Sequence, residues 1–178
     1  MKRVYLDHSA TTPVRPEVAQ IVMEYMTDKF GNPSSVHSFG REVKAALDKA
    51  REQVAALINA QAEEILFTSG GTESDNMAVL GAARTYAERG KHIITSAIEH
   101  HAVLYACQAL EKEGFTVTYL PVDEMGLVSV DELQKAIRPE TILISIMHVN
   151  NEVGTIQPIA EIGQIAAERG IIFHTDAV

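Results

Sequence analysis

The sequence is poor in cysteine, with Cys107 alone among 178 residues. A single cysteine excludes an internal disulfide framework and favours a reducing compartment, so we expect a cytoplasmic protein. No apolar run approaches the length needed to span a membrane. Near the N-terminus, Asp7 comes before any apolar stretch has formed, which argues against a secretory signal peptide.

Clusters of positive charge are also lacking. The formal net charge is −9, and no basic stretch offers a surface for nucleic acid or an anionic membrane. A content of 46% hydrophobic and 22% charged residues is typical of a globular protein with one sizeable core. We therefore expect one main domain and a small-molecule ligand, with no direct binding to nucleic acid or membrane.

Short β-rich runs alternate with longer segments of helical period. The predicted strands are residues 65–68, 92–96, 115–120, 142–149 and 171–175. The predicted helices are residues 16–25, 41–58, 74–88, 103–112, 130–137 and 159–168. Gly90, Gly114 and Gly170 each follow a helical segment, where a left-handed residue often ends a helix. This alternation predicts an α/β fold with a mainly parallel sheet sandwiched by helices. Residues 1–15 lie outside the alternation, and we expect them to belong to another lobe or to an interface, with 16–178 in the main domain.

A glycine-containing turn follows the first predicted strand. Gly70 and Gly71 let the backbone approach an anion closely, and the helix after them offers unpaired N–H groups and the positive end of its dipole. The lysine of the G-x-x-x-x-G-K-[ST] motif and the G-x-G-x-x-G spacing are both missing, so a small phosphate ester fits better than a nucleotide. An ordinary strand-to-helix turn explains the same residues equally well when they are taken alone.

Polar side chains follow four of the predicted strands. They are Thr72, His100, Asn151 and Asp176, each in the segment after a different strand. Because ligands of parallel sheets bind beyond the carboxyl ends of the strands, these residues are expected to share one site. Each also has an unremarkable structural explanation, and their conjunction carries the inference.

Pyridoxal phosphate is the ligand that this combination fits. Gly71 and Thr72 would hold its phosphate, His100 would stack on its ring, and Asn151 would hydrogen-bond its phenolic oxygen. An ionised Asp176 beside the pyridine nitrogen would favour the protonated ring, which is the better electron sink. A metal-dependent hydrolase using His100, His174 and Asp176 is the alternative, although strand alternation would turn His174 away from a shared centre.

Five motifs, in order along the chain, resemble those of the cysteine desulfurases. They are residues 7–13 (DHSATTP), 30–35 (FGNPSS), 67–74 (FTSGGTES), 99–103 (EHHAV) and 148–154 (HVNNEVG). The resemblance runs along the whole chain. It is strongest to the branch that serves iron–sulfur and nitrogenase assembly, within the class V aminotransferase group of fold-type I pyridoxal phosphate enzymes. It implies the same cofactor contacts at Gly71, Thr72, His100, Asn151 and Asp176.

The resemblance also implies an activity. Members of this family are homodimers that remove sulfur from L-cysteine, leaving L-alanine and an enzyme persulfide. The sulfur then passes to iron–sulfur scaffold proteins and other sulfur acceptors. His100 is implied as a catalytic proton carrier as well as a stacking residue.

Two covalent participants of the family are not found at suitable positions. The lysines of this sequence fall on predicted helices, at the amino end of a strand, or in the early segments, so none is expected to form the Schiff base. Cys107 lies within an amphipathic helix and is expected to pack in the core, since buried thiols are common. We therefore expect an N-terminal portion of a cysteine desulfurase that is inactive alone. A piece of a longer protein is the favoured explanation, and a free-standing, non-enzymatic assembly module is the alternative.

Overall fold

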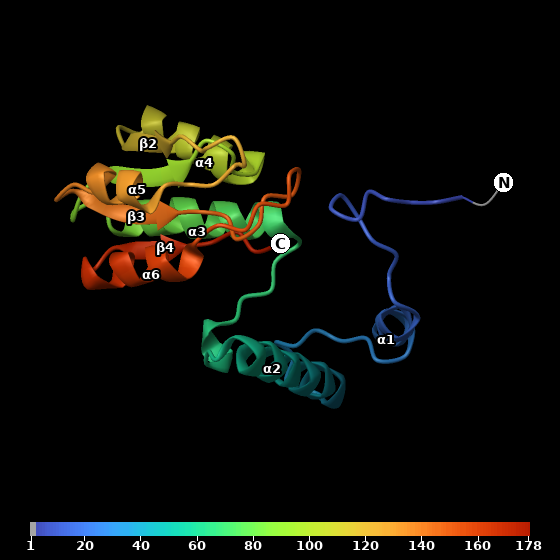
Figure 1. The fold of residues 1–178 in the computed structure, drawn as a ribbon. Coiled ribbons are helices and arrows are strands. Elements are labelled where there is room, and N and C mark those ends of the chain that lie inside the picture. Colours follow the sequence, from blue (N-terminus) through green and yellow to red (C-terminus); the bar gives the residue numbers. More distant parts are fainter. Residues whose placement is uncertain (1–2) are drawn as a thin grey trace. The chain divides into compact units, whose positions relative to one another are not determined.

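The computed structural model describes residues 3–178, so Met1 and Lys2 lie outside the described residues. The chain divides into two compact units, Met1–Phe67 and Thr68–Val178 (Figure 1). The boundary between these units follows Phe67 and does not test the predicted assignment of residues 1–15 to another lobe. That assignment stays a prediction.

The first unit consists of helices and connecting segments. Helix α1 spans Pro16–Thr27, α2 spans Ser38–Ile58, and the short 3-10 helix η1 spans Ala62–Glu64. Helix α2 begins after His37, whose side chain accepts a hydrogen bond from the N–H of Gly40, and it ends at Asn59 with a left-handed φ of 56°. No residue of α1 is buried.

The prediction of a strand at residues 65–68 was wrong. The N–H of Ile65 donates to the carbonyl of Ala62, and its own carbonyl accepts from the guanidinium of Arg51. These local bonds replace strand pairing. Leu66 and Phe67 remain 67% and 49% exposed, so their apolar character does not place this segment inside a sheet.

The second unit holds a four-stranded parallel sheet. Its strands are β1 (His92–Ser96), β2 (Thr116–Leu120), β3 (Thr141–Ser145) and β4 (Ile172–His174), in the order β2-β1-β3-β4. Its helices are α3 (Gly71–Thr85), α4 (His101–Lys112), α5 (Val130–Ala136) and α6 (Ile159–Glu168). The predicted α/β architecture is confirmed, with four of the five predicted strands and all six predicted helices present.

Helices cover both faces of this sheet. Ile93 of β1 and Leu143 of β3 pack with α3 and α4 on one face, while the next residues along each strand, Ile94 and Ile144, pack with α5 and α6 on the other. This alternation follows from the two-residue period of a strand. Each strand therefore supplies apolar side chains to two separate core clusters.

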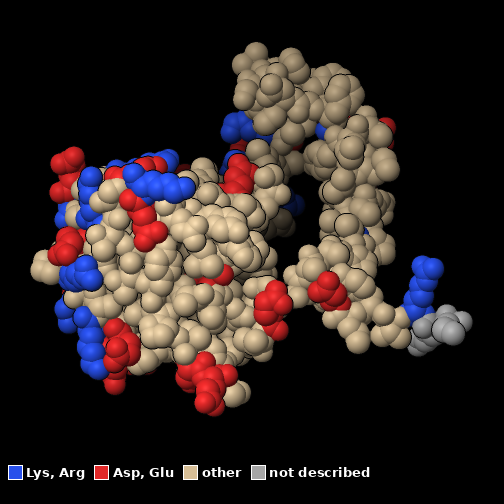
Figure 2. All heavy atoms as spheres, turned by 90° about the horizontal axis from the view of Figure 1, so that it is seen from above, with Lys and Arg blue, Asp and Glu red and all other residues tan. Residues whose placement is uncertain are grey.

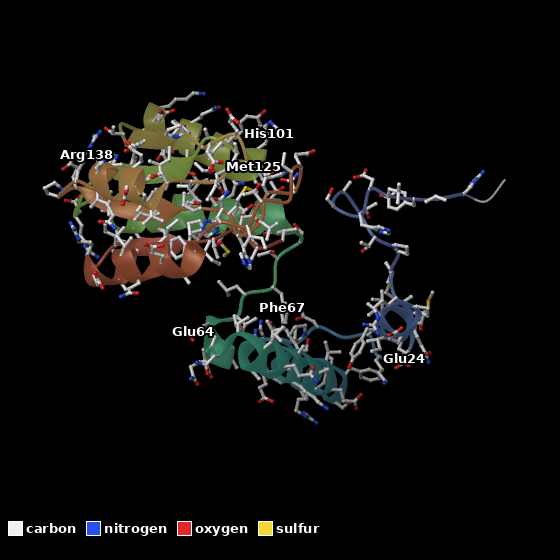
Figure 3. The ribbon with its side chains drawn as sticks, viewed as in Figure 1. Glu24, Glu64, Phe67, His101, Met125 and Arg138 are labelled. Carbon is white, nitrogen blue, oxygen red and sulfur yellow. The ribbon has the colours of Figure 1, made fainter. Side chains whose placement is uncertain are left out.

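The strand order creates a place where ligands commonly bind. The chain passes from β1 outward to β2 and then returns to β3 on the other side of β1, so the connections diverge between β1 and β3. In open parallel sheets the crevice at such a switch point is the usual ligand site. In Figure 3, His101 and Met125 lie at the end of the unit where β1 and β2 finish, and Arg138 lies at the opposite end.

Charged side chains of both signs share the surface. Figure 2 shows blue and red atoms interspersed along one rim of the molecule, with mostly uncharged residues over the rest of the face in view. Within residues 3–178, no helix is long and apolar enough to cross a membrane.

The predicted helix-ending glycines differ in their backbone geometry. Gly114 and Gly170 have φ of 88° and 64°, as expected for left-handed residues after α4 and α6. Gly90 does not have a positive φ; instead, a Cβ there would lie 2.2 Å from the carbonyl oxygen of Glu140. Gly90 is thus required by the close approach of two backbone segments.

Candidate cofactor-binding site

The start of α3 leaves backbone N–H groups without a capping side chain. The first helical hydrogen bond runs from the N–H of Ser74 to the carbonyl of Gly70, and no side chain caps the helix. The N–H groups of Gly71, Thr72 and Glu73 therefore precede the first intrahelical donor and point along the positive end of the helix dipole. The helix begins three residues earlier than predicted, which brings Gly71 and Thr72 into its first turn.

Hydrogen bonds within the turn fix its shape. The Glu73 carboxylate accepts from both the backbone N–H and the hydroxyl of Ser69, at 2.6 Å each, and these bonds lower the pKa of Glu73. The hydroxyls of Thr68 and Ser74 lie 2.6 Å apart. Thr72 is exposed, and a Cβ on Gly70 would meet nothing within 4 Å, whereas a Cβ on Gly71 would lie 2.7 Å from Cγ2 of Val178. The turn is consequently ordered and open on one side.

His100 precedes α4 and caps it. Its Nδ1 accepts a hydrogen bond of 3.1 Å from the N–H of Ala102, so a neutral ring carries its proton on Nε2. This cap holds the imidazole at the carboxyl end of β1. The ring itself is exposed, as a group that stacks on a ligand must be before the ligand binds.

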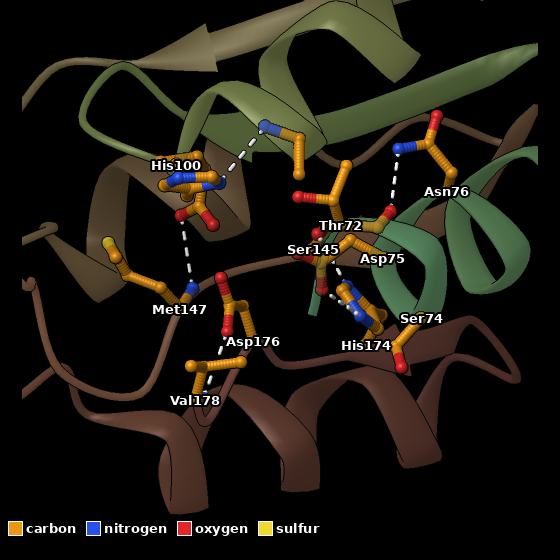
Figure 4. A network of polar contacts seen from close by, with 12 residues as sticks. Thr72, Ser74, Asp75, Asn76, His100, Ser145, Met147, His174, Asp176 and Val178 are labelled. Atoms are coloured by element: carbon orange, nitrogen blue, oxygen red, sulfur yellow. Dashed lines mark hydrogen bonds and ion pairs between the residues drawn. The ribbon is translucent and has the colours of Figure 1, made fainter. Parts of the chain in front are cut away.

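Asp176 lies two residues beyond β4 and is only 9% exposed. Its Oδ1 accepts a hydrogen bond from the N–H of Val178 at 3.0 Å, and its carbonyl accepts from the N–H of His148 at 2.7 Å. The second bond continues the β3–β4 ladder past the end of both strands. A buried carboxylate is thereby held at the same edge as His100, and Figure 4 shows both side chains and Thr72 in one view, each with hydrogen bonds of its own.

Asn151 is exposed in the loop after β3, and its Nδ2 donates to Glu152 at 2.8 Å. Among the described residues, no hydrogen bond or ion pair joins Asn151 to the other predicted site residues. Its neighbour Asn150 is buried: its Oδ1 accepts from the N–H groups of Glu152 and Val153, and its Nδ2 donates to the carbonyl of Ile98. Asn150 thus ties this loop to the segment before His100 and leaves Asn151 on its outer side.

The sequence did not assign a role to Asp75, which is 4% exposed on α3. Its Oδ1 lies 3.6 Å from Nε2 of His174, whose Nδ1 lies 2.8 Å from the Ser145 hydroxyl. Burial, with the nearby charge of Asp176, raises the pKa of Asp75 to about 6. The signal was present in the sequence, because Asp75 shares a four-residue spacing with Val79 and Ala83, the other buried residues of α3.

His174 lies within this network, in contact with Asp75 and Ser145. Burial lowers its pKa, so the ring is neutral near pH 7. Within residues 3–178, no three His, Cys, Asp or Glu side chains are grouped as ligands for a metal ion. The geometry therefore gives the metal-hydrolase alternative no support.

The arrangement fits a phosphorylated pyridine. Three free N–H groups and a hydroxyl suit the phosphate, a buried carboxylate suits a protonated ring nitrogen, and an exposed imidazole suits the ring face. All of them belong to the unit Thr68–Val178. They lie at the carboxyl edge of the sheet, as expected from the sequence.

Five lysines and the cysteine lie in the segments where we expect them from the sequence. Lys44 and Lys49 are in α2, Lys112 in α4 and Lys135 in α5, while Lys91 precedes β1 at the amino edge of the sheet. Cys107 of α4 is fully buried in the core, and burial raises its pKa to about 12. The prediction that Cys107 packs in the core is confirmed.

Comparison with known proteins gives the family. The model of the aminotransferase class-V family matches residues 4–178. Cysteine desulfurase IscS of Dictyoglomus turgidum is 60% identical over 179 residues, covering 100% of this chain and 45% of that protein. The solved structure of a NifS-like protein has a TM-score of 0.95 and 42% identity, covering 99% of this chain and 49% of its own.

A second solved structure, described as SspA in complex with cysteine, has a TM-score of 0.93 and 46% identity over 97% of this chain and 50% of its own. The chain thus spans about half the length of the proteins that it matches. The predicted relationship to cysteine desulfurases and to their fold is confirmed. Since the family model covers nearly every residue, the chain belongs to the class-V aminotransferase family.

Proposed function

We propose that this chain is the cofactor-binding part of a cysteine desulfurase, an enzyme that takes sulfur from L-cysteine and leaves L-alanine. Pyridoxal phosphate is the proposed cofactor. One observation carries the proposal: the free N–H groups of α3, the ring of His100 and the buried carboxylate of Asp176 occupy the same edge of the sheet. The similarity to cysteine desulfurase IscS, and to a solved structure described as SspA in complex with cysteine, supports the choice of substrate.

Each proposed contact uses a group that is available in the structure. The N–H groups of Gly71 and Thr72, with the Thr72 hydroxyl, would bind the phosphate. Asp176 would pair with the ring nitrogen, and His100 would stack against the ring. Asn151 would bind the phenolic oxygen through its side-chain amide, which requires it to leave its present bond to Glu152.

Bound pyridoxal phosphate supplies an electron sink that stabilises negative charge at the α-carbon of an amino-acid substrate. Asp176 would strengthen that property by favouring a proton on the ring nitrogen, because a carboxylate beside the pyridine nitrogen stabilises its charged form. His100 would hold or move a proton at Nε2, since its Nδ1 is already engaged by Ala102.

We assign no covalent step to this chain. Lys112 and Lys135 lie on helices, and Lys91 lies at the opposite edge of the sheet from His100. The thiol of Cys107 is buried and stays protonated at neutral pH, which makes it a poor nucleophile. The Schiff-base lysine and the persulfide cysteine are therefore proposed to lie outside these 178 residues. Iron–sulfur scaffolds and other sulfur acceptors, a homodimer and a cytoplasmic location are proposed for the complete enzyme.

Titration of the purified chain with pyridoxal phosphate, followed by absorbance and fluorescence, tests the proposal. We expect reversible saturable binding that borohydride does not make covalent. His100→Ala should weaken it about tenfold, since stacking contacts contribute on the order of 1 kcal/mol or more. Glu161→Gln, an exposed change in α6, is the control and should have no effect. Absence of binding, or binding that ignores His100→Ala and Asp176→Asn alike, would refute the assignment.

A further inference from the structure

Glu99 is a buried acid directly before His100, and none of the roles above uses it. It is 4% exposed. Its Oε1 accepts hydrogen bonds from the Ser96 hydroxyl at 2.6 Å and from the backbone N–H of Met147 at 3.0 Å. Ser96 is the last residue of β1, and Met147 follows β3 by two residues. A single carboxyl oxygen therefore joins the ends of the two strands that flank the switch point.

The second oxygen of Glu99 has a different environment. Oε2 is fully buried and has no hydrogen-bond partner among the described residues. An ionised carboxylate with an unsatisfied buried oxygen is costly, whereas a protonated one presents a neutral hydroxyl there. The burial of Oε2 without a partner thus favours the protonated acid.

The surrounding charges favour it too. Asp176 after β4 and Asp75 on α3 are the acids that face Glu99, and burial together with their negative charge raises its pKa to about 7, against the opposing effect of the bonds from Ser96 and Met147. The charge of Glu99 also raises the pKa of Cys107 on α4, but this thiol carries no charge at neutral pH. A proton on Glu99 leaves fewer like charges next to Asp176.

We propose that Glu99 is a positioning residue: in its protonated form, it joins β1 to β3 and thereby fixes His100 at the carboxyl edge of the sheet. The consequence for cofactor binding rests on the function proposed above. The joining of the strands and the protonation of Glu99 do not depend on that function. The role of Glu99 and the proposed function can therefore be refuted separately.

Substitutions at Glu99 separate the joining role from the charge. Glu99→Gln keeps a carbonyl oxygen for Ser96 and Met147 and replaces the hydroxyl with an amide that cannot ionise. Glu99→Ala removes the connection altogether. Glu161→Gln makes the same change of charge on an exposed position of α6 and serves as the control.

The first readout is thermal stability between pH 5 and 8 without cofactor. Because the pKa of Glu99 in the folded chain is above its ordinary value of 4.5, folding takes up a proton between about pH 4.5 and 7, and stability falls as pH rises through this window. Glu99→Gln lacks that loss, so its Tm relative to the unsubstituted chain should rise by about 3 °C or more from pH 5 to 8. A difference that stays constant with pH, as expected for Glu161→Gln, would overturn the protonated state.

The second readout is hydrogen exchange at the N–H of Ala102, which is bonded to Nδ1 of His100. Exchange should be at least about tenfold faster in Glu99→Ala and within about twofold of the unsubstituted chain in Glu99→Gln. Equal protection in Glu99→Ala would overturn the positioning role. If Glu99→Ala does not fold, the pH comparison with Glu99→Gln still decides the proposal.

The third readout is the affinity for pyridoxal phosphate, expected to be about tenfold weaker in Glu99→Ala and within about threefold in Glu99→Gln. If Glu99→Gln lost as much affinity as Glu99→Ala, the retained carbonyl oxygen would not preserve the site, and the positioning role would be contradicted. If the unsubstituted chain binds no pyridoxal phosphate, the proposed function fails, and the first two readouts alone judge Glu99.

Discussion

Asp75 of α3 and His174 of β4 face each other next to the candidate site, with 3.6 Å between Oδ1 and Nε2. Their side chains are 5% and 14% exposed, so little water separates them. The other ring nitrogen of His174 lies 2.8 Å from Ser145 of β3. The imidazole of His174 thus connects helix α3 to β4, the strand that leads to Asp176.

Replacing Asp75 should change how stability depends on pH. Its pKa in the folded chain is about 6, above the ordinary 3.8, so the folded chain holds a proton there between about pH 4 and 6 and stability falls as pH rises through that window. Asp75→Asn removes the effect. Relative to this variant, the free energy of unfolding of the unsubstituted chain should fall by on the order of 1 kcal/mol between pH 4 and 7. Urea unfolding measures this difference. A gain in relative stability over the same range would contradict the assignment.

Ser145→Ala should destabilise the chain by about 1–3 kcal/mol, because a buried nitrogen of His174 loses its partner. The free energy of unfolding from urea titration measures this change. Ser38→Ala, at an exposed position in the first turn of α2, is the control and should stay within about 0.5 kcal/mol. Similar values for the two variants would show that the Ser145 hydroxyl contributes nothing.

Cys107 should be chemically inert in the folded chain. The thiol is fully buried and its pKa is raised to about 12, chiefly by burial and secondly by the charge of Glu99. We expect no reaction with an aromatic disulfide reagent at pH 8 over minutes, and one thiol per chain after unfolding in guanidinium chloride. Rapid labelling of the native chain would reopen its role as a sulfur carrier.

Two glycines should respond oppositely to alanine. At Gly90 a Cβ would lie 2.2 Å from the carbonyl oxygen of Glu140, so Gly90→Ala should destabilise the chain by about 1–3 kcal/mol. At Gly81, inside α3, a Cβ meets nothing within 4 Å, so Gly81→Ala should stabilise it by up to about 1 kcal/mol. Chemical denaturation measures both, and a destabilising Gly81→Ala would show that this face of α3 is not free.

Hydrophobic period was sufficient to predict the sheet and its helices. The runs 92–96 and 115–120 correspond to β1 and β2, and their apolar residues, buried in β1 and partly or fully buried in β2, pack into the two core clusters. The run 65–68 has the same composition but no neighbouring strand with which to pair, and composition does not report pairing. Gly90 looked like a helix-ending residue, yet its reason is a tertiary contact with Glu140 that no local pattern shows.

The candidate site was predictable to the extent that it follows from topology. Residues after parallel strands meet at one edge, which brought His100 and Asp176 together in the prediction. The acids around them were harder to interpret, since Asp75 depends on its contact with His174, and Glu99 on hydrogen bonds from Ser96 and Met147 across the fold.

Amide chemical shifts of the isotopically labelled chain during titration with pyridoxal phosphate test the central claim most directly. The N–H signals of Gly71, Thr72 and Glu73 should move together with those around His100 and Asp176. Pyridoxal without phosphate should move the second group and leave the α3 signals unchanged. Shifts confined to the opposite edge of the sheet, around Arg138, or no shifts at all, would contradict the site described here.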